Sequence, residues 1–360
     1  MAHIRKSRSG HGWEARYRDP HGEERSRTFR TKRDAQQFVA RAESDLQRGE
    51  WLDPRVGRIR FEEWAREWLA TSVHLKPRTR YGYERLLEGE VLPVFGKQRI
   101  ASIERVDIRR FIAELTTAGK AAGTVRNTVT VLSNVFNVAL DSGAVKANPC
   151  AGVKLPRSSR DEMLFIDPPQ IAALASAIGD QHSLLVKTAA YTGLRAGELE
   201  ALRVRRVDLD KRTFDVVESL SEVSGKLFFV ETKTYSRRQV GVPQMLAGEL
   251  AEHIEARALG PDDLVFAGQR GGPMRHNSFY SRHFKPAVRR AGLPEGFRFH
   301  DLRHTCAALL ISQGAHPRAI MERLGHSTVQ VALDRYGHLF PAIHTELTDA
   351  LDRLYRSEAA

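Results

Sequence analysis

The sequence has few cysteines and no long apolar run. Cys150 and Cys306 are the only cysteines among 360 residues. Two cysteines so far apart build neither a disulfide framework nor a metal-binding cluster, so both are expected to be reduced and partly buried. No stretch of about 18 apolar residues is present, and the first residues lack the apolar core of a signal peptide. We therefore expect a cytoplasmic protein without membrane association.

Acidic residues are outnumbered, which leaves a net charge of +12 and an isoelectric point of about 9.9. A protein this basic usually meets a polyanion, and nucleic acid is the leading candidate; a merely soluble basic surface is the alternative. With 41% hydrophobic residues, the chain can build real cores rather than stay disordered. At about 100–200 residues per domain, its length predicts two or three domains.

Half of the net charge lies in the first tenth of the chain. Residues 1–33 hold ten Lys/Arg against four Asp/Glu, a net +6. Apolar and charged side chains alternate over 13–18, which predicts a strand, and a turn signal separates it from a second strand at 24–29. Thr31 is placed to cap a helix over 32–48. The pattern predicts a strand–strand–helix module whose basic face contacts DNA, with a solvated charged sheet as the alternative.

Residues 58–150 show helical patterns almost throughout. One apolar stripe consists of Phe61, Trp64, Ala65, Trp68 and Leu69. Pro77 suits the first position of the next helix, and Asp107 and Thr124 are placed to cap two more. These signals predict a domain of four or five helices, with its aromatic residues in the core rather than stacked on bases.

Residues 151–160 form a Pro/Ser/Arg-rich linker. The remaining residues, 161–360, mix helical patterns with three strand patterns, which lie at 213–217, 227–231 and 238–242. The chain as a whole is expected to be an α+β multidomain protein. Its parts are a small sheet with a helix, an all-α domain, and a mainly α domain with a small antiparallel sheet.

Four short segments of the C-terminal half carry groups suited to chemistry. Gly193 should end a helix, with Arg195 and Glu198 three residues apart on the next one. Lys233 lies between two predicted strands and is expected at a hairpin tip. The other two segments supply His300, Arg303, His326 and Tyr336. Each residue alone would be an ordinary salt bridge, cap, core residue or solvated side chain, so only their joint occurrence indicates a site.

His300 and His304 also match the H-x-x-x-H pattern of zinc peptidases. Asp301 would have to replace the usual glutamate base, and the cation of Arg303 beside a zinc ion is unfavourable. No third ligand follows at a typical spacing. No metal or other cofactor is expected.

Together the four segments resemble the tyrosine recombinase (phage integrase) family. The family's catalytic set is Arg, Lys, His, Arg, His or Trp, and Tyr, in chain order. The matching residues are Arg195, Lys233, His300, Arg303, His326 and Tyr336. Glu198 matches the acidic residue that usually follows the first arginine, and the ten-residue spacing before the tyrosine also fits.

The resemblance also implies a role for each part of the chain. Residues 1–57 resemble an arm-type DNA-binding domain and 58–150 a helical core-binding domain. Residues 161–360 would then be the catalytic domain with a C-terminal assembly helix. An apolar stripe in that helix consists of Ile343, Leu347, Leu351, Leu354 and Tyr355. This stripe packs either on a neighbouring protomer or on its own domain.

The chemistry explains the residue types. Two guanidiniums, Arg195 and Arg303, can grip phosphate oxygens and stabilise added charge, and His326 adds a donor. His300 could position the phosphate or help take the tyrosine proton. Tyr336 would attack the phosphodiester to give a 3′-phosphotyrosyl link. The best candidate acid for the leaving 5′ oxygen is Lys233.

The resemblance predicts an integrase that integrates a mobile element and also excises it. It would act as a homotetramer on two duplex DNA attachment sites, of core type and arm type, in the cytoplasm of a bacterial host and associated with the nucleoid. An excisionase and a DNA-bending host factor are further family expectations. One alternative is a monomeric nicking-closing enzyme of the type IB topoisomerase kind. The other is a non-catalytic DNA-binding regulator that kept the fold.

Overall fold

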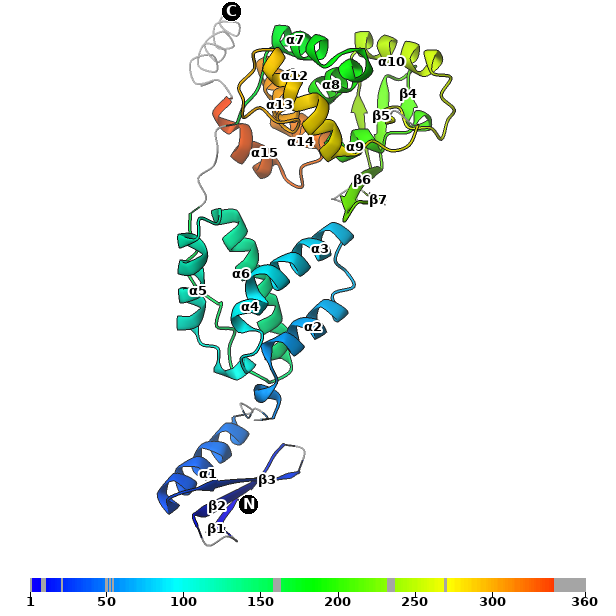
Figure 1. The fold of residues 1–360 in the computed structure, drawn as a ribbon. Coiled ribbons are helices and arrows are strands. Elements are labelled where there is room, and N and C mark those ends of the chain that lie inside the picture. The colour runs from blue at the N-terminus through cyan, green and yellow to red at the C-terminus, as the bar shows by residue number, and fades with distance from the viewer. Residues whose placement is uncertain are drawn as a thin grey trace, which may run out of the picture. The chain divides into compact units, whose positions relative to one another are not determined.

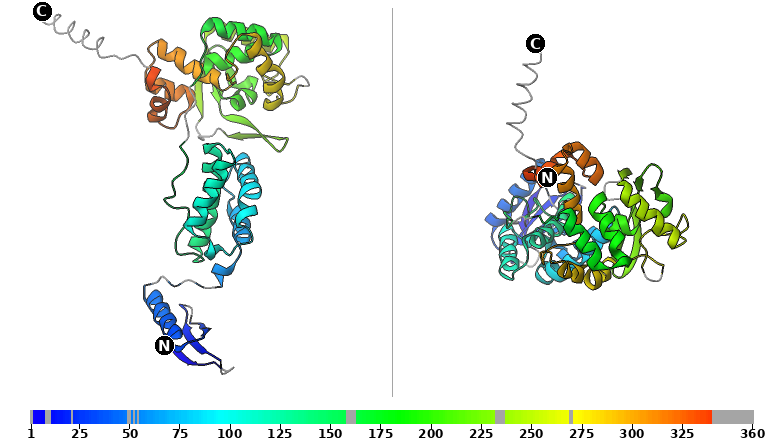
Figure 2. Two further views of the ribbon diagram at one scale, coloured as in Figure 1. Left: turned by 60° about the vertical axis from the view of Figure 1, so that its left-hand side comes forward. Right: turned by 90° about the horizontal axis from the view of Figure 1, so that it is seen from above.

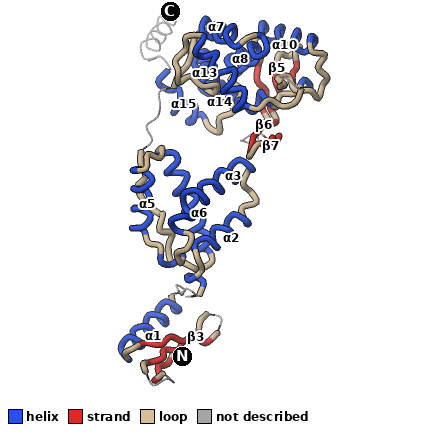
Figure 3. The backbone as a smooth tube through the Cα atoms, in the orientation of Figure 1, coloured by secondary structure: helices blue, strands red, loops and turns tan. Residues whose placement is uncertain are grey.

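The computed structural model describes residues 2–7, 11–20, 22–48, 51, 53, 55–157, 163–231, 237–268 and 271–339. The chain divides into two compact units, Met1–Arg160 and Asp161–Ala360. Both combine helices with small antiparallel sheets, as the colours of Figure 3 show, so the predicted α+β class is confirmed. In the part of the chain that is described, no helix is both long and apolar enough to span a membrane.

The first unit begins with a three-stranded antiparallel sheet in the order β1-β2-β3. Its elements are β1 (His3–Lys6), β2 (Trp13–Arg18), β3 (Glu24–Phe29) and the helix α1 (Lys32–Gln47). Ala15 and Tyr17 point inward from β2 and are buried, as their alternation predicts. The Thr31 hydroxyl accepts from the Asp34 N–H, so the predicted cap of α1 is confirmed. Strand β1 carries three polar residues among four and was not predicted.

The rest of the first unit is helical (Figure 1). Its α-helices are α2 (Phe61–Thr71), α3 (Pro77–Leu86), α4 (Leu92–Phe95), α5 (Arg105–Thr117) and α6 (Ala122–Asp141). Short turns of other helix types are η1 (Val56–Arg58), η2 (Leu87–Val91) and η3 (Ile100–Ser102). Pro77 begins α3 as predicted. Trp64 and Trp68 are buried in the core of these helices, which confirms their predicted structural role.

Two predicted caps of this unit are wrong. Helix α5 begins before Asp107, whose carboxylate accepts from the Glu104 N–H at 2.9 Å, so Asp107 is the third helical residue and Glu104 the cap. Helix α6 begins before Thr124, whose carbonyl accepts from the Thr128 hydroxyl. An acidic or hydroxyl side chain serves the first turn from more than one position, so its presence leaves the helix start uncertain by two or three residues.

The second unit contains most of the helices (Figure 1). Its α-helices are α7 (Pro168–Ile178), α8 (Asp180–Thr192), α9 (Ala196–Glu200), α10 (Gln244–Ala256), α11 (His276–Phe279), α12 (Lys285–Arg290), α13 (Asp301–Ser312), α14 (Pro317–Leu324) and α15 (Val329–Tyr336). Shorter turns are η4 (Val204–Arg206), η5 (Tyr280–Phe284) and η6 (Gly337–Leu339). Most of the helices pack with one sheet around a large core that includes Phe214, Phe284 and Leu302. A second, smaller core joins α13, α14 and α15 and includes Leu324 and Tyr336.

The strands of the second unit form two separate sheets. These are β4-β5-β8 and β6-β7, with β4 (Val207–Asp208), β5 (Thr213–Val216), β6 (Glu218–Val223), β7 (Lys226–Glu231) and β8 (Arg238–Gly241). Ser224 and Gly225 both have positive φ and join β6 to β7 in a tight hairpin that extends from the helices of its unit (Figures 1 and 2).

The predicted hairpin around Lys233 is therefore wrong. Strand β7 pairs with β6, and β8 pairs with β5, so the chain between β7 and β8 connects two sheets. Strand β6 was not predicted from the sequence. The predicted strand at 227–231 was therefore paired with the next predicted strand along the chain. Lys233 itself lies outside the described residues.

Both cysteines are buried and neither forms a disulfide. Cys150 belongs to the first unit, and burial raises the pKa of its thiol to about 12. Cys306 lies on α13 of the second unit, where burial also raises the pKa of the thiol. Both residues are unpaired as predicted, and both are more fully buried than the partly buried state expected from the sequence.

Candidate catalytic site

Apart from Lys233, which lies outside the described residues, the predicted site residues gather where α8, α9, α13, α14 and α15 meet. Gly193 ends α8 in the left-handed conformation at φ 69°, which glycine adopts without strain. A Cβ atom at this position would lie 2.5 Å from a Leu324 methyl and 3.1 Å from the Cys306 sulfur. The close approach of α13 and α14 to the start of α9 therefore requires glycine at position 193.

Arg195 follows this turn and is the N-cap residue of α9 rather than a residue within the helix. Its guanidinium binds Glu198 Oε1 at 2.8 Å and donates to the Gly325 carbonyl at 3.2 Å. Glu198 also accepts from the Arg195 backbone N–H at 2.9 Å. The predicted pairing of these two residues is confirmed, and it fixes the guanidinium at the junction of α9 and α14.

Arg238 on β8 is a second partner of Glu198 that the sequence did not reveal. Its guanidinium binds the carboxylate at 2.7 and 3.0 Å, and both side chains are almost fully buried. Burial acts to raise the pKa of Glu198, but the hydrogen bonds and charge of Arg238, together with Arg195, outweigh it and lower the pKa. Glu198 is therefore an ionised bridge between two arginines.

Arg303 lies on α13 and is 3% exposed. Its guanidinium donates to the Gly193 carbonyl at 2.7 Å and to the Leu324 carbonyl. No carboxylate forms an ion pair with it among the described residues. Burial lowers the pKa of Arg303 to about 9, and the charge of Arg195 acts in the same direction. Glu198 acts on this cation only through its charge, without a hydrogen bond in the described part of the chain, so Arg303 is placed to bind an anionic ligand.

His300 and His326 lie near this cation. His300 precedes α13, and burial followed by the charges of His304 and Arg303 lowers its pKa to about 4. Burial and the charge of Arg303 lower the pKa of His326 to about 3. Its Nδ1 atom is buried without a hydrogen-bond partner among the described atoms. Both imidazoles are neutral near pH 7 and leave the positive charge to the arginines.

Tyr336 is the last residue of α15 and is 1% exposed. Its hydroxyl lies 2.9 Å from Nδ1 of His304, and its ring lies nearly parallel to that of His326 at 6.2 Å. Burial raises the pKa of the phenol, while the charge of Arg303 opposes the shift. The phenol is neutral in this state and needs a proton acceptor before it can attack.

The structure thus brings together five of the six predicted residues, and Glu198 with them; Lys233 lies outside the described part. Sequence reasoning missed Arg238 and assigned His304 only to a rejected zinc site. Among the described residues, no group of three or more His, Cys, Asp or Glu could hold a metal ion. Arg238 lies in a short run of basic residues at the start of a predicted strand, which could have drawn attention to it. Nothing in the sequence links it to Glu198.

The charges of this cluster, which we call the arginine cluster (Arg195, Arg238 and Arg303), do not balance. Glu198 is the one carboxylate that binds any of them among the described residues. Three arginines around one carboxylate give the site a net positive charge, and buried groups surround it. Such a site favours an anionic ligand with several acceptor oxygens.

Replacing Glu198 with glutamine is expected to destabilise the fold strongly. The change leaves two arginines without their shared anion, and breaking a buried ion pair from one side costs about 3–5 kcal/mol. For a unit of this size, the melting temperature of the full chain should fall by roughly 10 °C in calorimetry. The matched control is Glu218→Gln, whose partly exposed pair with Arg203 should contribute about 1 kcal/mol or less. Equal shifts for the two variants would contradict the shared role of Glu198.

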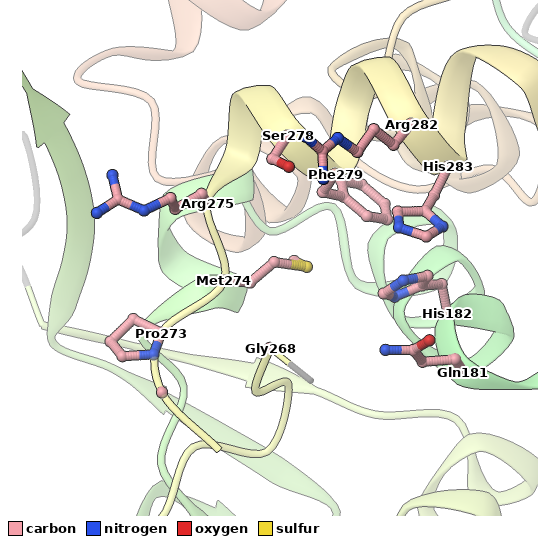
Figure 4. A pocket seen from close by; sticks show the side chains of 11 residues that line it. Gln181, His182, Gly268, Pro273, Met274, Arg275, Ser278, Phe279, Arg282 and His283 are labelled. Carbon is pink, nitrogen blue, oxygen red and sulfur yellow. The ribbon is translucent and has the colours of Figure 1, made fainter. Parts of the chain in front are cut away.

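A separate cavity of about 450 Å³ is lined by residues of α8, α11, η5 and the loop before α11 in the same unit (Figure 4). His182 and His283 lie side by side on one wall with ring centroids 4.7 Å apart, and Arg275 lies on the opposite side. Burial, followed by the charge of His283, lowers the pKa of His182 to about 4. None of the five catalytic residues that the structure describes lines this cavity, so it is distinct from the arginine cluster.

Comparison with known proteins decides the family. Residues 165–342 match the phage integrase family, 60–116 match a phage integrase N-terminal SAM-like domain, and 2–48 match a phage integrase N-terminal domain. The ICEBs1 integrase of Bacillus subtilis is 31% identical over 93% of this chain and 95% of its own length. The chain belongs to the phage integrase family of tyrosine recombinases. A putative prophage phiRv2 integrase of Mycobacterium tuberculosis is 30% identical to this integrase over 99% of the chain and 96% of its own length.

Solved structures agree with the fold of the integrase. The Tn1549 transposon integrase, in complex with transposon right end DNA, has a TM-score of 0.71 at 21% identity. The match covers 82% of this chain and 100% of that one. A lambda integrase tetramer bound to a Holliday junction has a TM-score of 0.57 at 20% identity over 90% of this chain and 95% of that one. The family match makes the integrase a site-specific tyrosine recombinase, and the solved structures show that it shares their fold.

Proposed function

We propose that this integrase cleaves and rejoins duplex DNA at attachment sites through a 3′-phosphotyrosyl intermediate. The observation that carries the proposal is the arginine cluster beside Tyr336. Arg303 is buried, no carboxylate of the described segments forms an ion pair with it, and burial lowers its pKa to about 9. A scissile phosphate would supply an anion for this site. Negative charge builds up on the phosphate in the transition state, so the arginines would stabilise the transition state more than the bound substrate.

Each residue has a role in this reaction. Arg195 and Arg303 would bind the non-bridging oxygens, because guanidiniums are rigid donors that remain charged. His300 and His326 are neutral and would donate hydrogen bonds to the same phosphate. Tyr336 would attack the phosphorus, and the released 5′ oxygen would take its proton from Lys233. Because the phosphotyrosyl bond conserves the energy of the broken phosphodiester, rejoining needs no external energy source.

Arg238 would act through Glu198 rather than on the phosphate. Its guanidinium already binds that carboxylate through two nitrogens and donates to the Arg323 carbonyl at 3.1 Å. Arg238 fixes the position of the Glu198 carboxylate, and this carboxylate in turn fixes the guanidinium of Arg195. We therefore assign Arg238 as a positioning residue of the phosphate site.

The other parts of the chain would bind DNA away from the scissile phosphate. We propose residues 1–57 as the arm-type domain, 58–150 as the core-binding domain and 151–160 as their linker to the catalytic domain, 161–360. Strand exchange between two duplexes needs four protomers, so a homotetramer on DNA is proposed, with the C-terminal segment as its assembly element. Excision of the same mobile element, with an excisionase and a DNA-bending host factor as partners, extends the proposal.

A nicked suicide substrate tests the reaction. Duplexes are made from the DNA that flanks the integrase gene, with a nick that lets a short downstream fragment leave after cleavage. The upstream fragment with a 5′ label should become bound to protein, whereas a label on the downstream fragment should be released with a free 5′ hydroxyl. Linkage of the downstream label to protein, or no linkage on any flanking duplex, would refute the 3′-phosphotyrosyl mechanism.

A further inference from the structure

His304 is buried beside the nucleophile, and the reaction as described leaves it without a role. It lies on α13 directly after Arg303, and α15 brings Tyr336 against it across 32 residues of sequence. Its Nδ1 atom is 2.9 Å from the phenol oxygen, and the two rings meet edge to face at 5.7 Å. Among the described residues, this nitrogen is the single hydrogen-bond partner of the phenol.

The direction of this hydrogen bond follows from burial. A buried hydroxyl needs an acceptor for its proton, and His304 Nδ1 is the acceptor in contact with it. Burial lowers the pKa of His304, so the imidazole is neutral and one of its nitrogens carries no proton. The phenol therefore donates to a bare Nδ1, and the imidazole proton resides on Nε2.

The other two histidines of the site do not make this contact. His300 meets His304 edge to face with ring centroids 5.1 Å apart, and no hydrogen bond joins it to the phenol among the described residues. His326 faces the phenol ring rather than its oxygen, with an angle of 15° between the ring planes. His304 is thus the histidine placed to receive the proton.

Resting on the proposed function, we propose that His304 accepts the phenolic proton when Tyr336 attacks the scissile phosphate. The phenol O–H bond breaks, its proton moves to His304 Nδ1, and the oxygen forms the bond to phosphorus. The bond from phosphorus to the 5′ oxygen breaks, and that oxygen takes a separate proton from the acid. In rejoining, the imidazolium returns its proton to the leaving phenol oxygen, so the step is balanced in both directions.

The position of α13 couples this step to phosphate binding. Arg303 and His304 are consecutive residues, and after burial the charge of Arg303 is the largest influence on the pKa of the phenol. Tyr336 is almost fully covered in the chain without DNA, so the phosphate reaches it only when the contacts around α15 open. Arg303 would then stabilise the developing phenolate charge while His304 removes the proton.

Replacing His304 with asparagine tests proton transfer while keeping an acceptor for the phenol hydrogen bond. The Asn side-chain oxygen can occupy the place of Nδ1 and accept the same hydrogen bond, but an amide is not a base near neutral pH. His304→Asn is expected to keep the melting temperature and DNA affinity of the wild type and to cleave the suicide substrate about 10²–10³-fold more slowly in single turnover. His304→Phe, which loses the acceptor altogether, should cleave no faster.

A more acidic nucleophile provides the decisive measurement. With 3,5-difluorotyrosine at position 336, the phenol loses its proton more easily, so His304→Asn should recover about tenfold or more in cleavage rate, while the wild type gains little. The matched control is Lys233→Ala, whose defect under the proposed function lies at the leaving 5′ oxygen, so a more acidic nucleophile should not restore its rate.

Two results would overturn the proposal. One is cleavage by His304→Asn at the wild-type rate, and the other is the same fluorotyrosine effect in wild type and variant. Failure of the proposed function itself looks different, because the wild-type integrase would then form no covalent adduct.

Discussion

Replacing Tyr336 with phenylalanine is expected to abolish the covalent protein–DNA adduct and with it all recombination. The change removes the one oxygen that can bond to phosphorus, so no residual rate through this intermediate remains. The adduct of the wild type, trapped on a nicked duplex and separated by denaturing electrophoresis, should be absent from the variant. Persistence of the adduct in Tyr336→Phe would show that another residue is the nucleophile.

Folding and DNA binding should survive this substitution. The phenylalanine ring fills the same buried space between His304 and His326 and loses one hydrogen bond, which costs about 1 kcal/mol. DNA affinity, which phosphate contacts over a wide surface dominate, should stay within about twofold in a gel-shift titration. A suitable control is Tyr280→Phe, because this ring stacks on His276 away from the arginine cluster and its loss of a hydroxyl should leave adduct formation intact.

The second large effect is expected for Arg303→Lys. Lysine lacks the planar fork, so it cannot bind the Gly193 and Leu324 carbonyls and a phosphate together. Losing one such stabilising group from a preorganised site lowers rates about 10²–10³-fold, and this factor is expected in single-turnover cleavage. DNA binding should change far less than cleavage, and an equal loss of both would place Arg303 outside the reaction.

The variant should also acquire a new pH dependence. Burial that lowers the pKa of the arginine to about 9 would bring a lysine amine, ordinarily about 10.4, close to neutral pH. Its charged form is then lost as the pH rises from 6 to 8, so residual cleavage by Arg303→Lys should fall over this range. The wild type keeps its guanidinium charged there. A flat profile for the variant, parallel to the wild type, would contradict the burial argument.

Local signals in the sequence predicted local structure well. The Thr31 cap, the start of α3 at Pro77 and the break at Gly193 each depend on one residue acting on its own backbone, so the residue type sufficed. Asp107 failed as a cap because its carboxylate acts from inside the first turn, and Thr124 failed because α6 begins two residues before it. Both residues correctly indicated that a helix begins nearby, but not at which residue it begins.

Contacts between distant segments were beyond the sequence. The pairing of β5 with β8 and of β6 with β7 depends on which strands meet in space, and three strand patterns in a row suggested a simpler order. Arg238 binds Glu198 across 40 residues, and His304 binds Tyr336 across 32. Neither partner changes the local pattern around it, so only the folded arrangement shows that these residues belong to the site.

The burial of both thiols has a practical consequence for following strand exchange. A thiol whose pKa is raised and which solvent does not reach forms little thiolate, the species that reacts with maleimide reagents. The two native cysteines are therefore expected to react little with maleimide dyes. A single cysteine introduced on the exposed face of α1, and another on the β6–β7 hairpin, could carry a donor and an acceptor dye. Single-molecule energy transfer would then follow the assembly of protomers on DNA without first removing Cys150 or Cys306.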